Sequence, residues 1–120
     1  MSVNILIVED EAITAMDLKY SLQDLGYDVV GTVDTGQDAI DASNELKPDV
    51  VLMDIKLKGD MEGTEAAQSI SKLGSHVIFV SANTDMSTIE ELNIEGTLAF
   101  VSKPFDINQL DKTIQNVVKD

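Results

Sequence analysis

Val50-Val51-Leu52-Met53-Asp54 is the stretch that decides the fold, because an unbroken apolar run leads directly into a carboxylate. Lys47-Pro48 precedes the run and Lys58-Gly59 follows it, and a short apolar run between such breakers indicates a strand buried on both faces. A second run, Ile5-Leu6-Ile7-Val8, leads into the acids 9–11. Ligands of open parallel sheets bind beyond the carboxyl ends of the strands. These acids are therefore predicted to meet at one edge of a sheet.

Strand and helix patterns alternate along the whole chain. The expected strands are 5–8, 28–33, 50–53, 77–80 and 98–101, and apolar residues at helical spacing follow them over 15–25, 39–46, 66–73, 86–92 and 107–118. Thr35 and Asp106 are predicted to cap the helices that begin after them. The alternation favours an α/β fold, a doubly wound parallel sheet of five strands with helices on both faces. Periodicity leaves the strand order open.

Composition narrows the class of protein. The 120 residues, 43% of them hydrophobic, fit one domain over 1–120. There is no cysteine, no signal-peptide pattern and no run near the roughly 20 apolar residues of a membrane span, so we expect a cytoplasmic protein without membrane contact. The net charge is −14 and no arginine is present, which argues against direct nucleic-acid binding. The methionines are expected to fill the core.

Polar residues end four of the expected strands: Glu9-Asp10, Asp54, Ser81 and Lys103. Two carboxylates about 4 Å apart repel by roughly 4 kcal/mol at an effective dielectric near 20, so a cation must offset their charge. Lys103 can offset part of it, and Mg²⁺, which prefers oxygen ligands, would offset the rest. In such a site Asp54 can attack phosphorus, while Lys103 and Ser81 contact the phosphoryl oxygens.

The order and spacing of Glu9-Asp10, Asp54, Ser81-Ala82 and Lys103-Pro104-Phe105 resemble those of the response-regulator receiver domain of two-component signal transduction. The resemblance covers essentially the whole chain. It implies the flavodoxin-like strand order 2-1-3-4-5 for the sheet. It also implies a phosphoprotein that requires Mg²⁺.

The resemblance implies a role for each residue around the acceptor. Asp54 would receive the phosphoryl group. Asp10 would bind Mg²⁺ directly and Glu9 would bind it through water, with Asp54 and the backbone carbonyl of Lys56 as further ligands. Lys103 would pair with the phosphoryl group.

A second set of residues is implied to relay or time the signal. Ser81 would be drawn toward the phosphoryl group, which makes room for Phe100 to rotate inward as an aromatic switch. Lys56 and Asn83 would flank the path of the hydrolytic water and influence the lifetime of the phosphorylated state. Lys103-Pro104 would be a cis peptide beside the site.

The function implied is a phosphorylation-dependent switch within a phosphorelay. A sensor histidine kinase or a phosphotransfer protein would donate the phosphoryl group to Asp54. The surface of 86–92, 98–101 and 107–118 would then change its affinity for a downstream protein, a covalently linked output domain or a second copy of the chain. We do not expect an enzyme that turns over an external substrate, although the domain would promote its own phosphorylation and dephosphorylation.

Other functions fit the residues less well. A haloacid-dehalogenase-type phosphatase needs a second acid two residues after the nucleophile, where Lys56 stands. A flavin mononucleotide site needs backbone donors after the first strand, where the acids 9–11 would repel the phosphate. A receiver-like protein-interaction module that is not phosphorylated stays open as the alternative.

Overall fold

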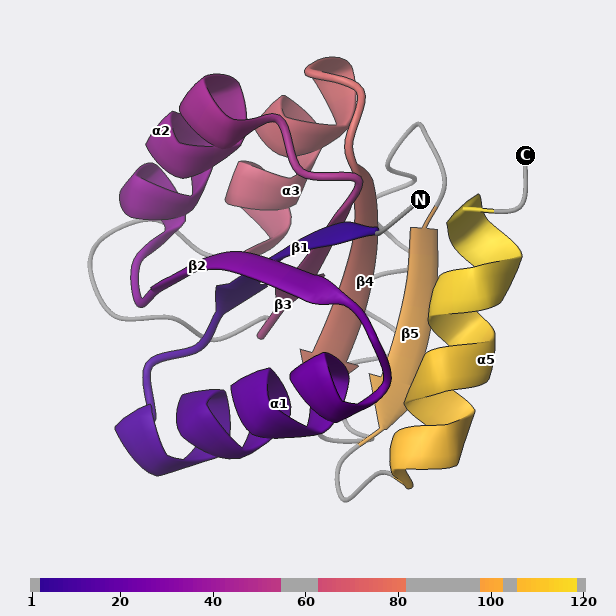
Figure 1. Ribbon diagram of the computed structural model, residues 1–120. Helices are drawn as coiled ribbons and strands as arrows, with labels where there is room; N and C mark the ends of the chain where they lie inside the picture. The colour runs from indigo at the N-terminus through magenta and orange to yellow at the C-terminus, as the bar shows by residue number, and fades with distance from the viewer. Residues whose placement is uncertain (1–2, 55–62, 82–97, 103–105, 119–120) are drawn as a thin grey trace.

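A parallel sheet forms the middle layer of the molecule (Figure 1). The structure is a computed structural model and describes residues 3–54, 63–81, 98–102 and 106–118. Its five strands have the order β2-β1-β3-β4-β5, and every neighbouring pair is parallel. This confirms the predicted α/β class and strand order. The elements are β1 (Asn4–Val8), α1 (Ala12–Asp24), β2 (Asp28–Val33), α2 (Gly36–Leu46), β3 (Val50–Met53), α3 (Gly63–Lys72), β4 (His76–Ser81), β5 (Leu98–Ser102) and α5 (Ile107–Val118). The helix predicted over 86–92 lies outside the described residues.

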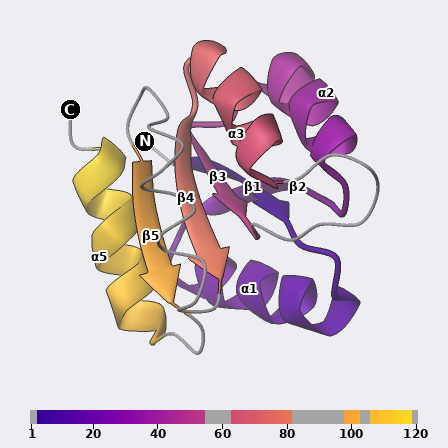
Figure 2. The ribbon, with the colours of Figure 1, turned by 180° about the vertical axis from the view of Figure 1, so that it is seen from behind.

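Helices cover both faces of the sheet, α1 and α5 on one and α2 and α3 on the other (Figures 1 and 2). Successive side chains of a strand point to opposite faces. Ile5 and Ile7 of β1 therefore pack with α1 and α5, whereas Leu6 and Val8 pack with α2 and α3. β3 divides in the same way and all four of its residues are buried. Burial on both faces is the reason why the central strands are unbroken apolar runs.

The two predicted helix caps are present. Thr35 Oγ1 accepts a hydrogen bond from the N–H of Asp38 at 3.1 Å, at the start of α2. Asp106 Oδ1 accepts one from the N–H of Asn108 at 2.9 Å, at the start of α5. These bonds satisfy N–H groups that have no partner within their own helix.

Some apolar residues of the predicted helical stripes are exposed. Leu25, Leu46 and Leu73 lie at or just beyond the ends of α1, α2 and α3, where the helix no longer faces the sheet. Met16 lies within α1 but on its outer side, so the prediction that the methionines fill the core is wrong for this residue. Within the described ranges, no helix has both the length and the apolar composition needed to cross a membrane.

Candidate functional site

Three acids meet at the carboxyl edge of the sheet because β1 and β3 are neighbours in register. The pairing ends with Val8 opposite Met53, so Glu9 and Asp54 are the next residues along each strand. The N–H of Asp54 donates to the carbonyl oxygen of Val8 at 3.1 Å, and the N–H of Glu9 donates to that of Val33 at 2.9 Å. Backbone hydrogen bonds thus continue past the strand ends and orient the acids that follow.

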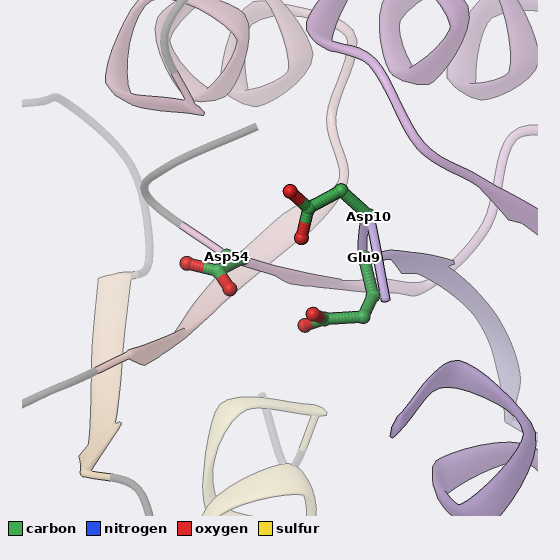
Figure 3. A group of neighbouring side chains, drawn as sticks. All are labelled: Glu9, Asp10 and Asp54. Carbon is green, nitrogen blue, oxygen red and sulfur yellow. The ribbon is translucent and has the colours of Figure 1, made fainter. Parts of the chain in front are cut away.

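The side chains of Glu9, Asp10 and Asp54 converge. One carboxylate oxygen from each lies within 4.8 Å of the others, and Figure 3 shows the three side chains directed toward a common space. Glu9 is buried, with 5% of its surface exposed, whereas Asp10 and Asp54 are half-buried. The N–H of Glu11 donates to Glu9 Oε1 at 3.4 Å, which helps to hold the buried carboxylate. Of the four acids predicted to meet at one edge, Glu9, Asp10 and Asp54 do so.

The electrostatics of this acid cluster call for a cation. Carboxylates at this separation repel by about 3 kcal/mol per pair at an effective dielectric near 20. Burial of Glu9 adds to the cost, because water solvates a buried charge poorly. Three carboxylate oxygens are the hard ligands that Mg²⁺ prefers. Asp10 and Asp54 are half-buried, so solvent reaches both side chains, and Mg²⁺ retains several waters when bound. The donor set therefore fits a magnesium ion.

The other predicted site residues are only partly within the described chain. Ser81 is the last residue of β4, and its backbone lies at the same edge of the sheet as the acid cluster, opposite Ser102 of β5. Phe100 lies in β5 opposite Phe79. Four further residues lie outside the described residues: Lys56, Asn83, Lys103 and Pro104. The roles assigned to all six stay predictions.

A groove of about 530 Å³ adjoins the acid cluster, and reasoning from the sequence did not anticipate it. Glu9 and Asp10 line one end, and Met16 and Tyr20 of α1 line a side. The signal in the sequence was a second apolar stripe on α1, formed by Ile13, Met16 and Tyr20. It lies beside the buried stripe and has the same helical spacing.

Comparison with known proteins agrees with the fold and the acid cluster. The family model of the response regulator receiver domain matches residues 5–115. The chain is 36% identical over 115 residues to the transcriptional regulatory protein PdtaR of Mycobacterium tuberculosis, a match that covers 95% of this chain and 56% of PdtaR. It is 33% identical over 121 residues to the chemotaxis protein CheY of Thermotoga maritima, with 99% and 100% covered. The chain thus spans about half the length of PdtaR and all of CheY.

A solved structure bears on the metal. The receiver domain of the sensor histidine kinase PA1611 from Pseudomonas aeruginosa PAO1 has a magnesium ion coordinated in its active-site cleft. It superposes on this chain with a TM-score of 0.84 at 25% identity, over 100% of both chains. The present chain shares with it the fold, and its own acid cluster fits the same ion. The family match over nearly the entire sequence shows that the chain belongs to the response regulator receiver domain family.

Proposed function

We propose that this domain is a phosphorylation-dependent switch of a two-component system, which accepts a phosphoryl group on Asp54 from a sensor histidine kinase or a phosphotransfer protein. The observation that carries the proposal is the convergence of Glu9, Asp10 and Asp54 within 4.8 Å on a receiver fold. Family membership supports the class of chemistry, and the acid cluster supports its location at the carboxyl edge of the sheet.

The acid cluster would hold Mg²⁺, with Asp10 and Asp54 as direct ligands, Glu9 as a ligand through water and the carbonyl oxygen of Lys56 as a further donor. Bound there, Mg²⁺ supplies positive charge that offsets both the carboxylates and the phosphoryl oxygens. The buried position of Glu9 gives the chain a carboxylate that is oriented before the metal arrives, because its Oε1 accepts the N–H of Glu11.

Phosphoryl transfer would proceed by nucleophilic attack of an Asp54 Oδ atom on the phosphorus of the donor. The new O–P bond forms on Asp54 as the N–P bond of a donor phosphohistidine breaks, and the imidazole nitrogen keeps the electron pair. Asp54 is half-buried, so solvent reaches part of it, and its backbone bond to Val8 fixes the strand end that carries it. Lys103 would pair with the phosphoryl oxygens, and Ser81 would donate a hydrogen bond to one of them.

Phosphorylation would change a surface of the domain, and the domain would release no reaction product from an external substrate. Movement of Ser81 toward the phosphoryl group would allow Phe100 to rotate inward, which would alter the surface made by residues 86–92, β5 and α5. That surface would bind a downstream protein, a linked output domain or a second copy of the chain. Lys56, Asn83 and Pro104 would border the phosphorylated Asp54 and influence its lifetime. The domain would act in the cytoplasm as a signalling module.

The test is the intact mass of the protein after incubation with Mg²⁺ and acetyl phosphate. We expect a base-labile gain of one phosphoryl group, which is lost in a chelator and in Asp54→Asn. Asp49→Asn is the matched control, because Asp49 stands at the other end of β3 and the substitution changes the charge equally. If wild-type protein gained no mass with any donor, the domain would instead be a protein-interaction module that is not phosphorylated. Phosphorylation of Asp54→Asn at the normal rate would rule out Asp54 as the acceptor.

A further inference from the structure

Two serines end neighbouring strands at the edge of the sheet where the acid cluster lies. β4 ends at Ser81 and β5 ends at Ser102, and the two residues are directly opposite one another in the parallel pairing. Figure 2 shows the two strands side by side, with their arrowheads at the same end. In the proposed function Ser81 is drawn toward the phosphoryl group, whereas Ser102 takes no part.

The pairing of β4 differs on its two sides. Among the described residues, its register with β3 ends where Met53 is opposite Phe79. Its register with β5 continues two residues further, to Ser81 opposite Ser102. The backbone at Ser81 is therefore paired with β5 and not with β3, the strand that leads into the proposed phosphoryl acceptor. β5 is thus the neighbour through which the position of Ser81 can be set.

The two serines belong to the same face of the sheet. Phe79 packs on the face covered by α2 and α3, whereas Val80 and Val101 pack on the face covered by α1 and α5. Successive residues of a strand alternate between the faces, so Ser81 and Ser102 both fall on the face of Phe79. Neighbouring strands lie about 4.8 Å apart. Two serines at paired positions on one face are therefore within reach of a hydrogen bond between their hydroxyl groups.

We propose that Ser102 is a positioning residue, which holds the hydroxyl of Ser81 by a hydrogen bond while Asp54 carries no phosphoryl group. The phosphoryl group would compete with Ser102 for that hydroxyl, and it would win because a charged acceptor forms the stronger hydrogen bond. The bond given up would reduce the net gain from engaging the phosphoryl group. Ser102 would thus set the threshold of the switch. This inference rests on the proposed function and adds a residue to its relay.

Competition of this kind has a consequence that a purely structural serine would not have. A contact made only in the unphosphorylated arrangement lowers the affinity of the site for a phosphoryl group. Removal of the Ser102 hydroxyl should therefore raise that affinity. The gain should disappear when Ser81 has no hydroxyl to release, because the two residues act through one hydrogen bond. A serine that only stabilised β5 would have the same effect with or without the hydroxyl of Ser81.

The test measures the dissociation constant of beryllofluoride, a tetrahedral analogue of a phosphoryl group on a carboxylate, by isothermal titration calorimetry in Mg²⁺. We expect Ser102→Ala to tighten binding about fivefold, the effect of one neutral hydrogen bond. Ser102→Thr keeps a hydroxyl and should stay within about twofold of wild type. In a Ser81→Ala background, Ser102→Ala should change the affinity by less than about twofold.

Ser75→Ala is the matched control, because the Ser75 hydroxyl donates to the carbonyl oxygen of Pro48 at 2.8 Å, away from the acid cluster. It should lower the stability of the fold and leave the affinity within about twofold of wild type. Unchanged affinity in Ser102→Ala, or an equal change with and without the Ser81 hydroxyl, would overturn the proposal and leave the proposed function standing. If wild-type protein neither bound beryllofluoride nor gained a phosphoryl group from acetyl phosphate, both would be overturned. Circular dichroism of each variant verifies that its fold is intact.

Discussion

β3 has an aspartate at each end, and the two carboxylates have different surroundings. Asp49, before the strand, accepts the N–H of Asn4 on its Oδ2 at 2.9 Å, and its own N–H donates to the carbonyl oxygen of Asn4 at 2.8 Å. Asp54, after the strand, carries its carboxylate into a cluster with Glu9 and Asp10. One carboxylate satisfies a backbone donor, and the other adds charge where charge already accumulates.

The difference shows that position in a parallel sheet, not residue type, decides which groups surround an acid. At the amino edge the polar groups tie loops together, as where Ser75 Oγ donates to the carbonyl oxygen of Pro48 at 2.8 Å. At the carboxyl edge the strand ends converge on a shared space, the place where open α/β sheets bind their ligands. The carboxylates of the acid cluster repel one another, and the same charges make the site favour a cation.

The largest expected contrast is in chemistry. Asp10→Asn should slow phosphorylation by acetyl phosphate in Mg²⁺ about 100-fold or more, because it removes a proposed ligand of the metal that would supply several kcal/mol of charge stabilisation. Asp49→Asn, with the same change of charge at the amino edge, should stay within about twofold of wild type, since β3 separates Asp49 from the cluster. Time courses of intact mass measure both rates. Equal slowing in the two variants would break the comparison.

The next largest contrast between the two ends of β3 should be in how Mg²⁺ changes the free energy of unfolding. At Mg²⁺ one hundredfold above its dissociation constant, the free energy of unfolding of wild-type protein should rise by about 2.7 kcal/mol, because the folded state alone offers the clustered ligands. Asp49→Ala should keep this increment, and Asp10→Asn should lose most of it. Urea unfolding in Mg²⁺ and in chelator, at matched ionic strength, gives the values. An increment retained by Asp10→Asn would show that the ion binds elsewhere.

Without metal the two aspartates should affect stability with opposite signs. In chelator, Asp54→Asn should raise the free energy of unfolding by about 1 kcal/mol, because it relieves repulsion in a half-exposed cluster. Asp49→Ala should lower it by about 1 kcal/mol, because the N–H of Asn4 loses its charged acceptor. The same urea titrations measure both. A lower free energy of unfolding in Asp54→Asn would mean that this acid of the carboxyl edge stabilises the metal-free fold.

The apolar pattern was enough to predict the layers of the fold. A strand such as β3, apolar at every position, must be covered on both faces, and alternation with helical stripes supplies the cover. The apolar pattern did not predict the order of the strands, because a strand is buried equally whichever strands it pairs with. It followed from the family resemblance. Leu46 and Leu73 stand at the predicted ends of their helices and are exposed, since helical spacing does not say where the sheet stops.

For the site, the sequence predicted the acids and missed the groove. Glu9, Asp10 and Asp54 follow buried runs directly, so strand geometry alone brings them to one edge. Met16 and Tyr20 have the spacing of a core stripe, and only the packing of α1 on the sheet shows that a different stripe is buried. A helix with two apolar stripes is therefore ambiguous until its partner is known.

The smallest expected effect concerns Tyr27, another residue near the amino edge of the sheet. It lies just before β2, and its hydroxyl donates to Asp111 of α5, which also accepts the side-chain N–H of Gln115 at 3.1 Å. Burial and the hydrogen bond to Asp111 raise the pKa of Tyr27 from 10.0 to about 12. The protonated hydroxyl makes this bond. Its contribution is therefore fully present below pH 10.0 and is lost as pH rises toward about 12.

Tyr27→Phe should therefore lower the free energy of unfolding at neutral pH by about 1 kcal/mol, the value of one partly exposed hydrogen bond. The free energy of unfolding of wild-type protein should fall between about pH 10 and pH 12 as Tyr27 ionises, and Tyr27→Phe should remove this part of the fall. Tyr20→Phe is the control, because Tyr20 is exposed on α1, and urea titrations across this range compare the two. A decline unchanged in Tyr27→Phe would mean that other groups titrate there. Polar contacts at the amino edge would then contribute less to the free energy of unfolding than the hydrogen bonds of Asp49 and Ser75 indicate.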